Sequence, residues 1–119
     1  MNINNVLEIA PAKIAHYCEE ENKAFAIMNA MHEEYKRERA KKYLSLKVQG
    51  LGTIKDIEYT LDCDLELVEI KGKELQAEAN YRMWRMRKDR AHDTFEAAME
   101  MGRNLRKEWF STNDTIKEG

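Results

Sequence analysis

Hydrophobic and polar residues alternate along most of this chain with the spacing of an amphipathic α-helix. Neither Gly nor Pro occurs from about Ala12 to Val48, and apolar residues recur there on three- and four-residue steps, from Ile14 to Leu46. Polar residues occupy some of the intervening steps, which is typical of a helix whose flank is only partly covered. The pattern predicts a long helix over residues 12–48, with Pro11 in its first turn, where the missing N–H costs nothing.

The helical pattern breaks at Gly50 and Gly52, two glycines so close that they mark a helix end and a turn. Thr53 and Asp56 then have the spacing of a capping box, with Asp where Glu or Gln is usual. We expect a short helix over residues 54–61. The run Asp62-Cys63-Asp64 offers the N-cap of a further helix.

A long last helix is predicted over residues 63–110, because apolar and small residues repeat there in heptads. One seam runs from Leu61 to Ala79 and a second from Ala91 to Trp109, with a slip in register between them. Heptads of this length suggest a coiled-coil-like seam, and the slip suggests a stutter or kink. Glycines on the seam either let another helix approach closely or are simply tolerated at about 1 kcal/mol each.

These elements predict an all-α fold in which a long N-terminal helix, a glycine-containing turn, a short helix and a long C-terminal helix form an elongated helical hairpin. Residues 1–110 are expected to be a single helical domain, and residues 111–119 a polar, disordered tail. The chain is 43% hydrophobic and 35% charged, which favours long helices. So short a chain has little core of its own, and the seam over 91–109 therefore predicts a coiled-coil-like homo-oligomer.

The residues that could act in catalysis or bind a metal do not form a recognisable motif. His16, His32 and His92 lack the spacing of zinc ligands, and no Glu-x-x-His occurs. Cys18 and Cys63 are read as free thiols, since neither belongs to a paired motif. With no signal peptide or apolar run of spanning length, we expect a cytoplasmic protein without membrane contact, cofactor or enzymatic activity.

Charge is unevenly distributed, although the formal net charge is only −2. Residues 36–55 sum to +6 and residues 56–80 to −6. Such blocks indicate either solvated helix faces or opposite surfaces that pair within or between subunits and leave a local basic patch. The basic block contains YKRERAKKY, with five basic residues and two tyrosines in nine positions. Clustered cations and aromatic rings suit a phosphate backbone with stacked bases.

A second cluster, Arg82 to Arg90 with Trp84 among its arginines, has a similar character. For each cluster the alternative is a solvated flank of a coiled coil. The first cluster supplies the predicted DNA-binding residues, which are Lys36, Arg37, Arg39, Lys41, Lys42 and Tyr43.

The order of these motifs resembles the UvsY family of phage recombination mediators over roughly residues 20–110. The resemblance rests on the first helix ending in YKRERAKKYLSLKVQG, the connector TIKDIEYTLDCDLELVEIKGKEL, and the closing GRNLRKEWF. It implies a homo-oligomer without a catalytic site that binds single-stranded DNA. It further implies that this oligomer loads a RecA-like recombinase onto DNA coated with single-stranded-DNA-binding protein.

The resemblance also assigns roles to residues. It maps DNA contacts onto Arg37, Arg39, Lys41 and Lys42. It maps oligomer contacts onto the last helix, at Phe95, Ala98, Gly102, Leu105 and Trp109. The acidic first half and the net charge of −2 depart from what strong DNA binding would favour.

Two other interpretations remain open at the level of sequence. The chain could be a small helical inhibitor, an anti-defence or host-takeover protein that blocks a host protein sterically or mimics nucleic acid. Residues 56–78, with eight acids against two lysines, would serve that role. It could also be a helical structural adapter with no nucleic-acid role.

Overall fold

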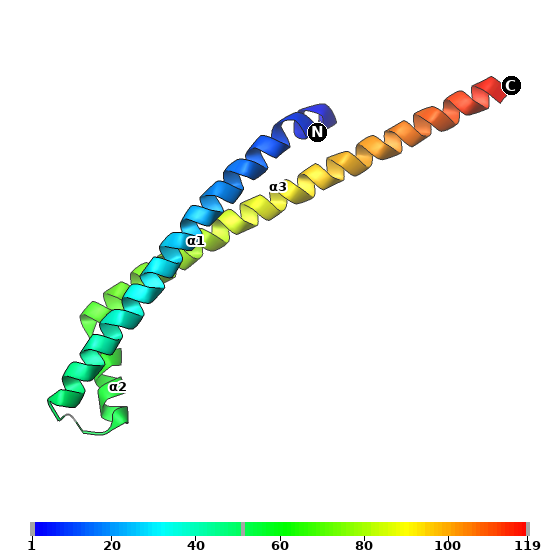
Figure 1. The fold of residues 1–119 in the computed structure, drawn as a ribbon. Helices are drawn as coiled ribbons and strands as arrows, with labels where there is room; N and C mark the ends of the chain where they lie inside the picture. The colour runs from blue at the N-terminus through cyan, green and yellow to red at the C-terminus, as the bar shows by residue number, and fades with distance from the viewer. Residues whose placement is uncertain (1, 51, 119) are drawn as a thin grey trace. The chain divides into compact units, whose positions relative to one another are not determined.

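The computed structural model describes residues 2–50 and 52–118, with side chains up to residue 110. This part of the chain contains three α-helices and no strand: α1 (Ile3–Val48), α2 (Ile54–Asp62) and α3 (Leu65–Glu118) (Figure 1). The predicted all-α fold with a long, a short and a long helix is confirmed. Packing divides the chain into two compact units: Glu21–Trp84, here called the hairpin unit, and Met1–Glu20 with Arg85–Gly119, the end unit.

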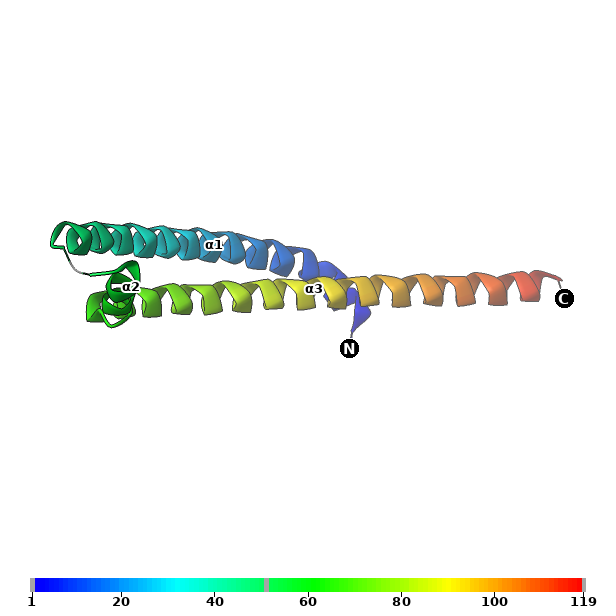
Figure 2. The same cartoon turned by 90° about the horizontal axis from the view of Figure 1, so that it is seen from below.

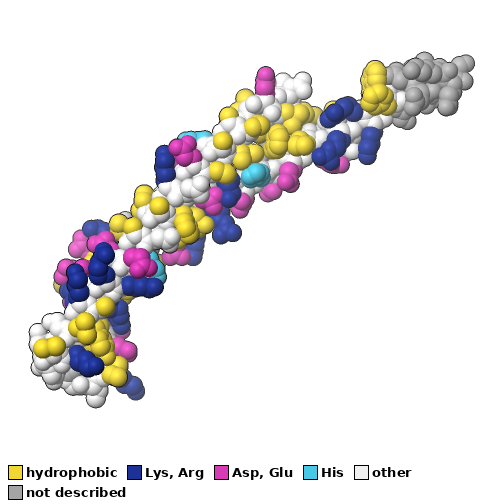
Figure 3. All heavy atoms as spheres, viewed as in Figure 1, with side chains coloured by type: hydrophobic (Ala, Val, Ile, Leu, Met, Phe, Trp, Pro, Cys, Tyr) yellow, Lys and Arg dark blue, Asp and Glu magenta, His cyan; other side chains and the backbone are white. Residues whose placement is uncertain are grey.

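In the hairpin unit, the second part of α1 and the first part of α3 run antiparallel as the two arms of a helical hairpin. Contacts progress in opposite directions along the two helices, from Lys42 with Asp64 to Phe25 with Tyr81. The short α2 lies where the two arms are joined (Figures 1 and 2). On the face drawn in Figure 3, acidic and basic side chains are intermixed, with hydrophobic side chains exposed between them.

The apolar core of the hairpin unit is small and lies beside α2. Ile57 and Leu61 of α2 and Leu67 of α3 are its buried side chains, each 3% exposed or less. Three side chains of α1 pack against this cluster and remain half-buried: Tyr35, Tyr43 and Leu46. α2 is therefore held by apolar contacts with both arms, which helps a helix of only nine residues to form.

The connection between α1 and α2 follows from its glycines and its cap. Gly50 and Gly52 have positive φ angles of 74° and 32°, a region that glycine enters without steric cost. The Thr53 side chain accepts the Asp56 N–H, and the Asp56 carboxylate accepts the Thr53 N–H, as the predicted capping box requires. A Cβ atom at Gly52 would collide with that carboxylate.

α3 begins with its own cap and turns an unexpected face toward α1. The Asp64 side chain accepts the Leu67 N–H at 3.0 Å, so Asp64 is the residue that caps the helix. Leu67 and Glu74 are the buried positions on this part of the helix. The predicted seam lies on another face, where Leu65 and Val68 are 84% and 54% exposed.

The end unit combines the first part of α1 with the second part of α3. α1 begins at Ile3, and Asn2 caps it by accepting the N–H groups of Asn4 and Asn5. The prediction that the helix starts near residue 12 with Pro11 in its first turn is therefore wrong. Pro11 lies about two turns inside α1, because the asparagine cap upstream supplies an earlier start than the proline suggested.

α3 also differs from its predicted course in two places. The units divide between Trp84 and Arg85, inside the register slip predicted between Ala79 and Ala91. The helix then continues to Glu118, past the predicted end near residue 110. The predicted polar tail covers residues 111–119, and the side chains of these residues lie outside the described part of the structure. Within the described residues, no helix contains a stretch long and apolar enough to cross a membrane.

Candidate nucleic-acid interface

The predicted DNA-binding residues all lie on the last four turns of α1, but the rest of the hairpin unit covers only some of them. Lys36, Arg37 and Lys41 are exposed. Arg39, Lys42 and Tyr43 are half-buried, where α1 meets α2 and the start of α3. Successive helical residues are rotated by about 100°, so one short run necessarily includes both exposed and covered positions.

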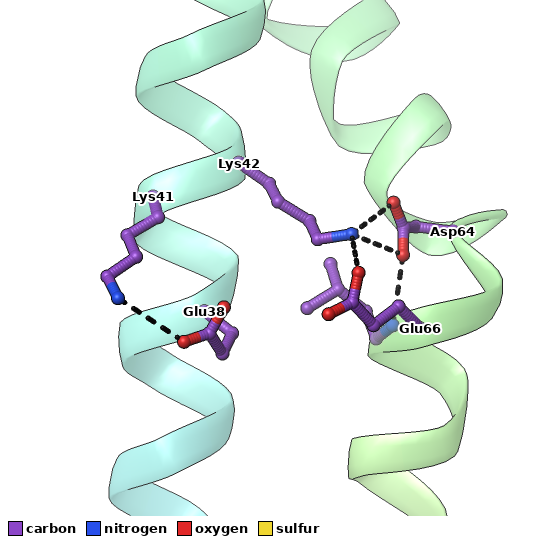
Figure 4. A network of polar contacts seen from close by, with 6 residues as sticks. Glu38, Lys41, Lys42, Asp64 and Glu66 are labelled. Atoms are coloured by element: carbon purple, nitrogen blue, oxygen red, sulfur yellow. Dashed lines mark hydrogen bonds and ion pairs between the residues drawn. The ribbon is translucent and has the colours of Figure 1, made fainter.

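Lys42 is an internal ion-pair partner of α3 (Figure 4). Its Nζ lies 2.9 Å and 3.0 Å from the two carboxylate oxygens of Asp64, and 2.8 Å from Glu66 Oε2. Only 26% of the side chain is exposed. This lysine therefore fastens the end of α1 to the first turn of α3.

Two members of this network, Lys42 and Asp64, have shifted pKa values. Hydrogen bonds to Glu66 and then to Asp64 raise the pKa of Lys42 above its usual value. The bond from Lys42, together with the Leu67 N–H, lowers the pKa of the Asp64 carboxyl. Both shifts favour the charged forms of Lys42 and Asp64, and the positive charge of Lys42 lies beside two carboxylates.

Arg39 and Tyr43 also face the hairpin unit. Arg39 Nη1 lies 3.4 Å from Asp62 Oδ1, at the end of α2. Tyr43 packs its ring against the apolar cluster beside α2. The prediction that opposite charge blocks pair within a subunit therefore holds for Arg39 and Lys42. Tyr43 instead contributes to the apolar packing of the hairpin unit.

The cations that remain outward form the candidate interface, here called the outer basic face. Lys36, Arg37 and Lys41 belong to it, and sequence reasoning missed Lys47, which is exposed in the last turn of α1. Lys36 and Lys47 are eleven residues apart, which brings them to the same side of the helix about three turns apart. Lys41 is 66% exposed and lies 3.4 Å from Glu38, so its charge is only partly compensated.

The second basic cluster is spread over both units. Arg82, in the hairpin unit, forms an ion pair with Glu78 one turn earlier. In the end unit, Arg87 and Arg90 border a groove together with Lys13 of α1. Most of that groove is apolar, with Val6 and Ile9 among its lining residues. The structure thus places Lys13 on the same groove as two of these arginines, which the sequence pattern did not indicate.

The residues predicted to mediate oligomerisation are divided between covered and exposed positions of the end unit. Ala98 is fully buried, and Phe95 and Gly102 are half-buried. Leu105 and Trp109 are 56% and 63% exposed. Only the last two turns of this seam therefore remain available to a second chain without rearrangement of the unit.

One polar group in the hairpin unit was missed by the sequence analysis. The Glu74 carboxylate is buried, and it accepts hydrogen bonds from His32 Nδ1 at 2.7 Å and Lys71 Nζ at 3.3 Å. Burial alone would raise its pKa, but the bonds from His32 and Lys71 outweigh that effect and lower it. Lys71 also lies over the Tyr35 ring, 4.9 Å from its centroid. The heptad spacing from Leu67 to Glu74 was the only signal for this position.

The described residues offer no candidate metal site. No cluster of three or more His, Cys, Asp or Glu side chains there could hold a metal ion. Cys18 and Cys63 are free thiols, as predicted. Comparison with models of protein families, with curated proteins and with solved structures finds no match.

Proposed function

We propose that this chain is a binding protein that contacts the phosphate backbone of single-stranded DNA through its outer basic face. In the role that the UvsY resemblance implies, it acts as a homo-oligomeric recombination accessory that helps to load a RecA-like recombinase onto DNA coated with single-stranded-DNA-binding protein. The observation that carries the proposal is the outward position of Lys36, Arg37, Lys41 and Lys47 on one helix end.

The geometry of the outer basic face supports a backbone contact more than a base-specific one. The four cations extend over about three turns of α1, or roughly 16 Å of helix. Affinity for a phosphate chain depends on how many cations reach it, and a local patch is sufficient when the net charge of the protein is near zero. Leu44 and Val48, 60% and 87% exposed on the same helix end, offer apolar surface to unstacked bases.

The same contacts weaken the alternative of an inhibitor that mimics nucleic acid. Such mimicry needs a continuous row of uncompensated carboxylates. In the acidic block, Asp62, Asp64 and Glu66 pair with cations of α1, and Glu74 is buried beside His32 and Lys71. A steric inhibitor that binds through other surfaces remains the second candidate function.

The test is a salt titration of single-stranded oligonucleotide binding by fluorescence anisotropy. Arg37→Glu with Lys41→Glu reverses two outward cations and leaves the ion pairs of Arg39 and Lys42 intact. We expect this double variant to weaken binding at low salt and to flatten the log–log slope by about 1.4, at about 0.7 per phosphate contact.

The matched control reverses two exposed cations elsewhere, Lys73→Glu with Arg103→Glu, which gives the same change in net charge. The control should bind like the wild-type chain at every salt concentration. The proposal fails if the wild type does not bind at low salt. It also fails if both double variants lose affinity equally, because only the total charge would then matter.

A further inference from the structure

An apolar stripe on the first part of α3 is largely exposed among the described residues of the hairpin unit. Its large members Leu65, Val68 and Leu75 are 84%, 54% and 53% exposed. A side chain at Gly72 would meet nothing within 4 Å. The stripe, here called the α3 stripe, steps by three or four residues along one side of the helix: Leu65, Val68, Gly72, Leu75, Ala79 and Met83.

The α3 stripe is separate from the face that packs within the chain. Leu67 and Glu74 are buried against the hairpin unit, and Val68 and Leu75 directly follow them in the sequence. Each is therefore rotated by about 100° around the helix axis from its buried neighbour. A helix with a second apolar seam at heptad spacing is built to pack against another helix on that side.

We propose that the α3 stripe pairs two copies of this chain, with their α3 helices antiparallel around a two-fold axis near residue 73. This inference is independent of nucleic-acid binding. It also differs from assembly through residues 91–109, because the stripe lies entirely within the hairpin unit.

Side-chain sizes along the stripe match this arrangement. With the axis near residue 73, Leu75 lies opposite the partner's Gly72, and Val68 lies opposite the partner's Ala79. Each large side chain then fills the space above a small one, which is how facing helix surfaces interdigitate. The open space around Gly72 lets the two helices approach closely at the axis.

Charges along the flank of the stripe select the antiparallel orientation. The flank reads Asp64, Lys71, Glu78 and Arg82, with alternating sign. In the antiparallel pair, Lys71 faces the partner's Glu78, and Asp64 faces the partner's Arg82. A parallel pair would instead place Asp64 against the partner's Glu69, and like charges across an interface are unfavourable. Each of the four also has an ion-pair partner within its own chain, but each is more than a quarter exposed and can share its charge with a second chain.

The first experiment measures mass by light scattering on the full chain. We expect the wild type to have at least twice the 14.0 kDa mass of one chain, and Leu75→Asp to halve the measured mass. The control Leu44→Asp introduces the same charge at a similarly exposed leucine of α1, and it should leave the mass unchanged. A wild-type chain that is monomeric at high concentration, or a control that halves the mass as well, overturns the proposal.

The second experiment tests the orientation with substitutions that keep the fold. In a background with Cys18→Ser and Cys63→Ser, Val68→Cys and Ala79→Cys chains are mixed under mild oxidation. We expect the mixture to form a disulfide-linked dimer and the Val68→Cys chain alone to form none, because its two thiols would lie about 16 Å apart along the antiparallel pair. Efficient crosslinking of the Val68→Cys chain alone would indicate a parallel pair and overturn the proposal.

Discussion

The small core beside α2 makes Leu67 a critical side chain of the hairpin unit. Leu67→Ala removes about three methylene-sized groups, worth roughly 0.8 kcal/mol each on transfer from water. Leu67 is only 2% exposed, so nearly the whole transfer term is lost. Tyr35, Tyr43 and Leu46 are half-buried and can relax into part of the space, which limits the cavity term. The expected loss is therefore about 3 kcal/mol, near the lower end for buried leucines.

A loss of this size is a large share of the free energy of unfolding of a domain, which is about 5–15 kcal/mol. Urea unfolding followed by circular dichroism measures it directly. With a slope of about 1–3 kcal/mol per molar urea, the midpoint should fall by roughly 1–3 M. Protein concentration has to be equal in all samples, because self-association stabilises the folded state by mass action.

The control is Leu44→Ala, which truncates a leucine that is 60% exposed on the outer side of α1. We expect it to change the free energy of unfolding by about 0.5 kcal/mol or less, as at other exposed sites. Equal losses for the two variants, or a loss below about 1 kcal/mol for Leu67→Ala, would refute the reasoning that this cluster is the core of the hairpin unit.

Two further variants test the polar contacts of the hairpin unit. The pKa of the Glu74 carboxyl is lowered from its usual 4.5, so its stabilising contribution is present above pH 4.5 and is lost as the pH falls through the lowered pKa. In urea unfolding at a series of pH values, Glu74→Gln should lose less stability than the wild type below that pH, and parallel curves would contradict this. Thr53→Ala removes the side-chain cap of α2 and should cost about 1 kcal/mol. Thr94→Ala, at an exposed position within α3, should cost nothing measurable, and equal losses for the two threonines would argue against the cap.

The sequence predicts the order of helices well because the signals are local. Glycines, a capping box and heptad spacing each act within a few residues, and α2 ends one residue beyond its predicted limit. The predicted start of α1 was wrong because Pro11 is a more conspicuous helix-start signal in the sequence than Asn2, which caps the helix upstream. Local signals thus locate helices, and competing caps decide their ends.

The candidate site was only partly predictable, because periodicity does not say which helix face meets which neighbour. α3 has one apolar seam through Val68 and a buried face through Leu67, one residue apart. Likewise, the basic run on α1 gave no sign that Lys42 would bind Asp64 while Arg37 would point outward. Those assignments depend on contacts between residues more than twenty positions apart, which no local pattern records.

The connection between α1 and α2 has a consequence for how this sequence can diverge. At Gly52, any substituent would strike the Asp56 carboxylate that caps α2, and the backbone there has a positive φ. Gly50 also has a positive φ but faces open space, a conformation that asparagine tolerates. In a set of homologous chains, position 52 should therefore remain glycine while position 50 drifts between glycine and asparagine. Gly50 and Gly52 look equivalent in one sequence, but homologous chains would thus vary at the first position and not at the second.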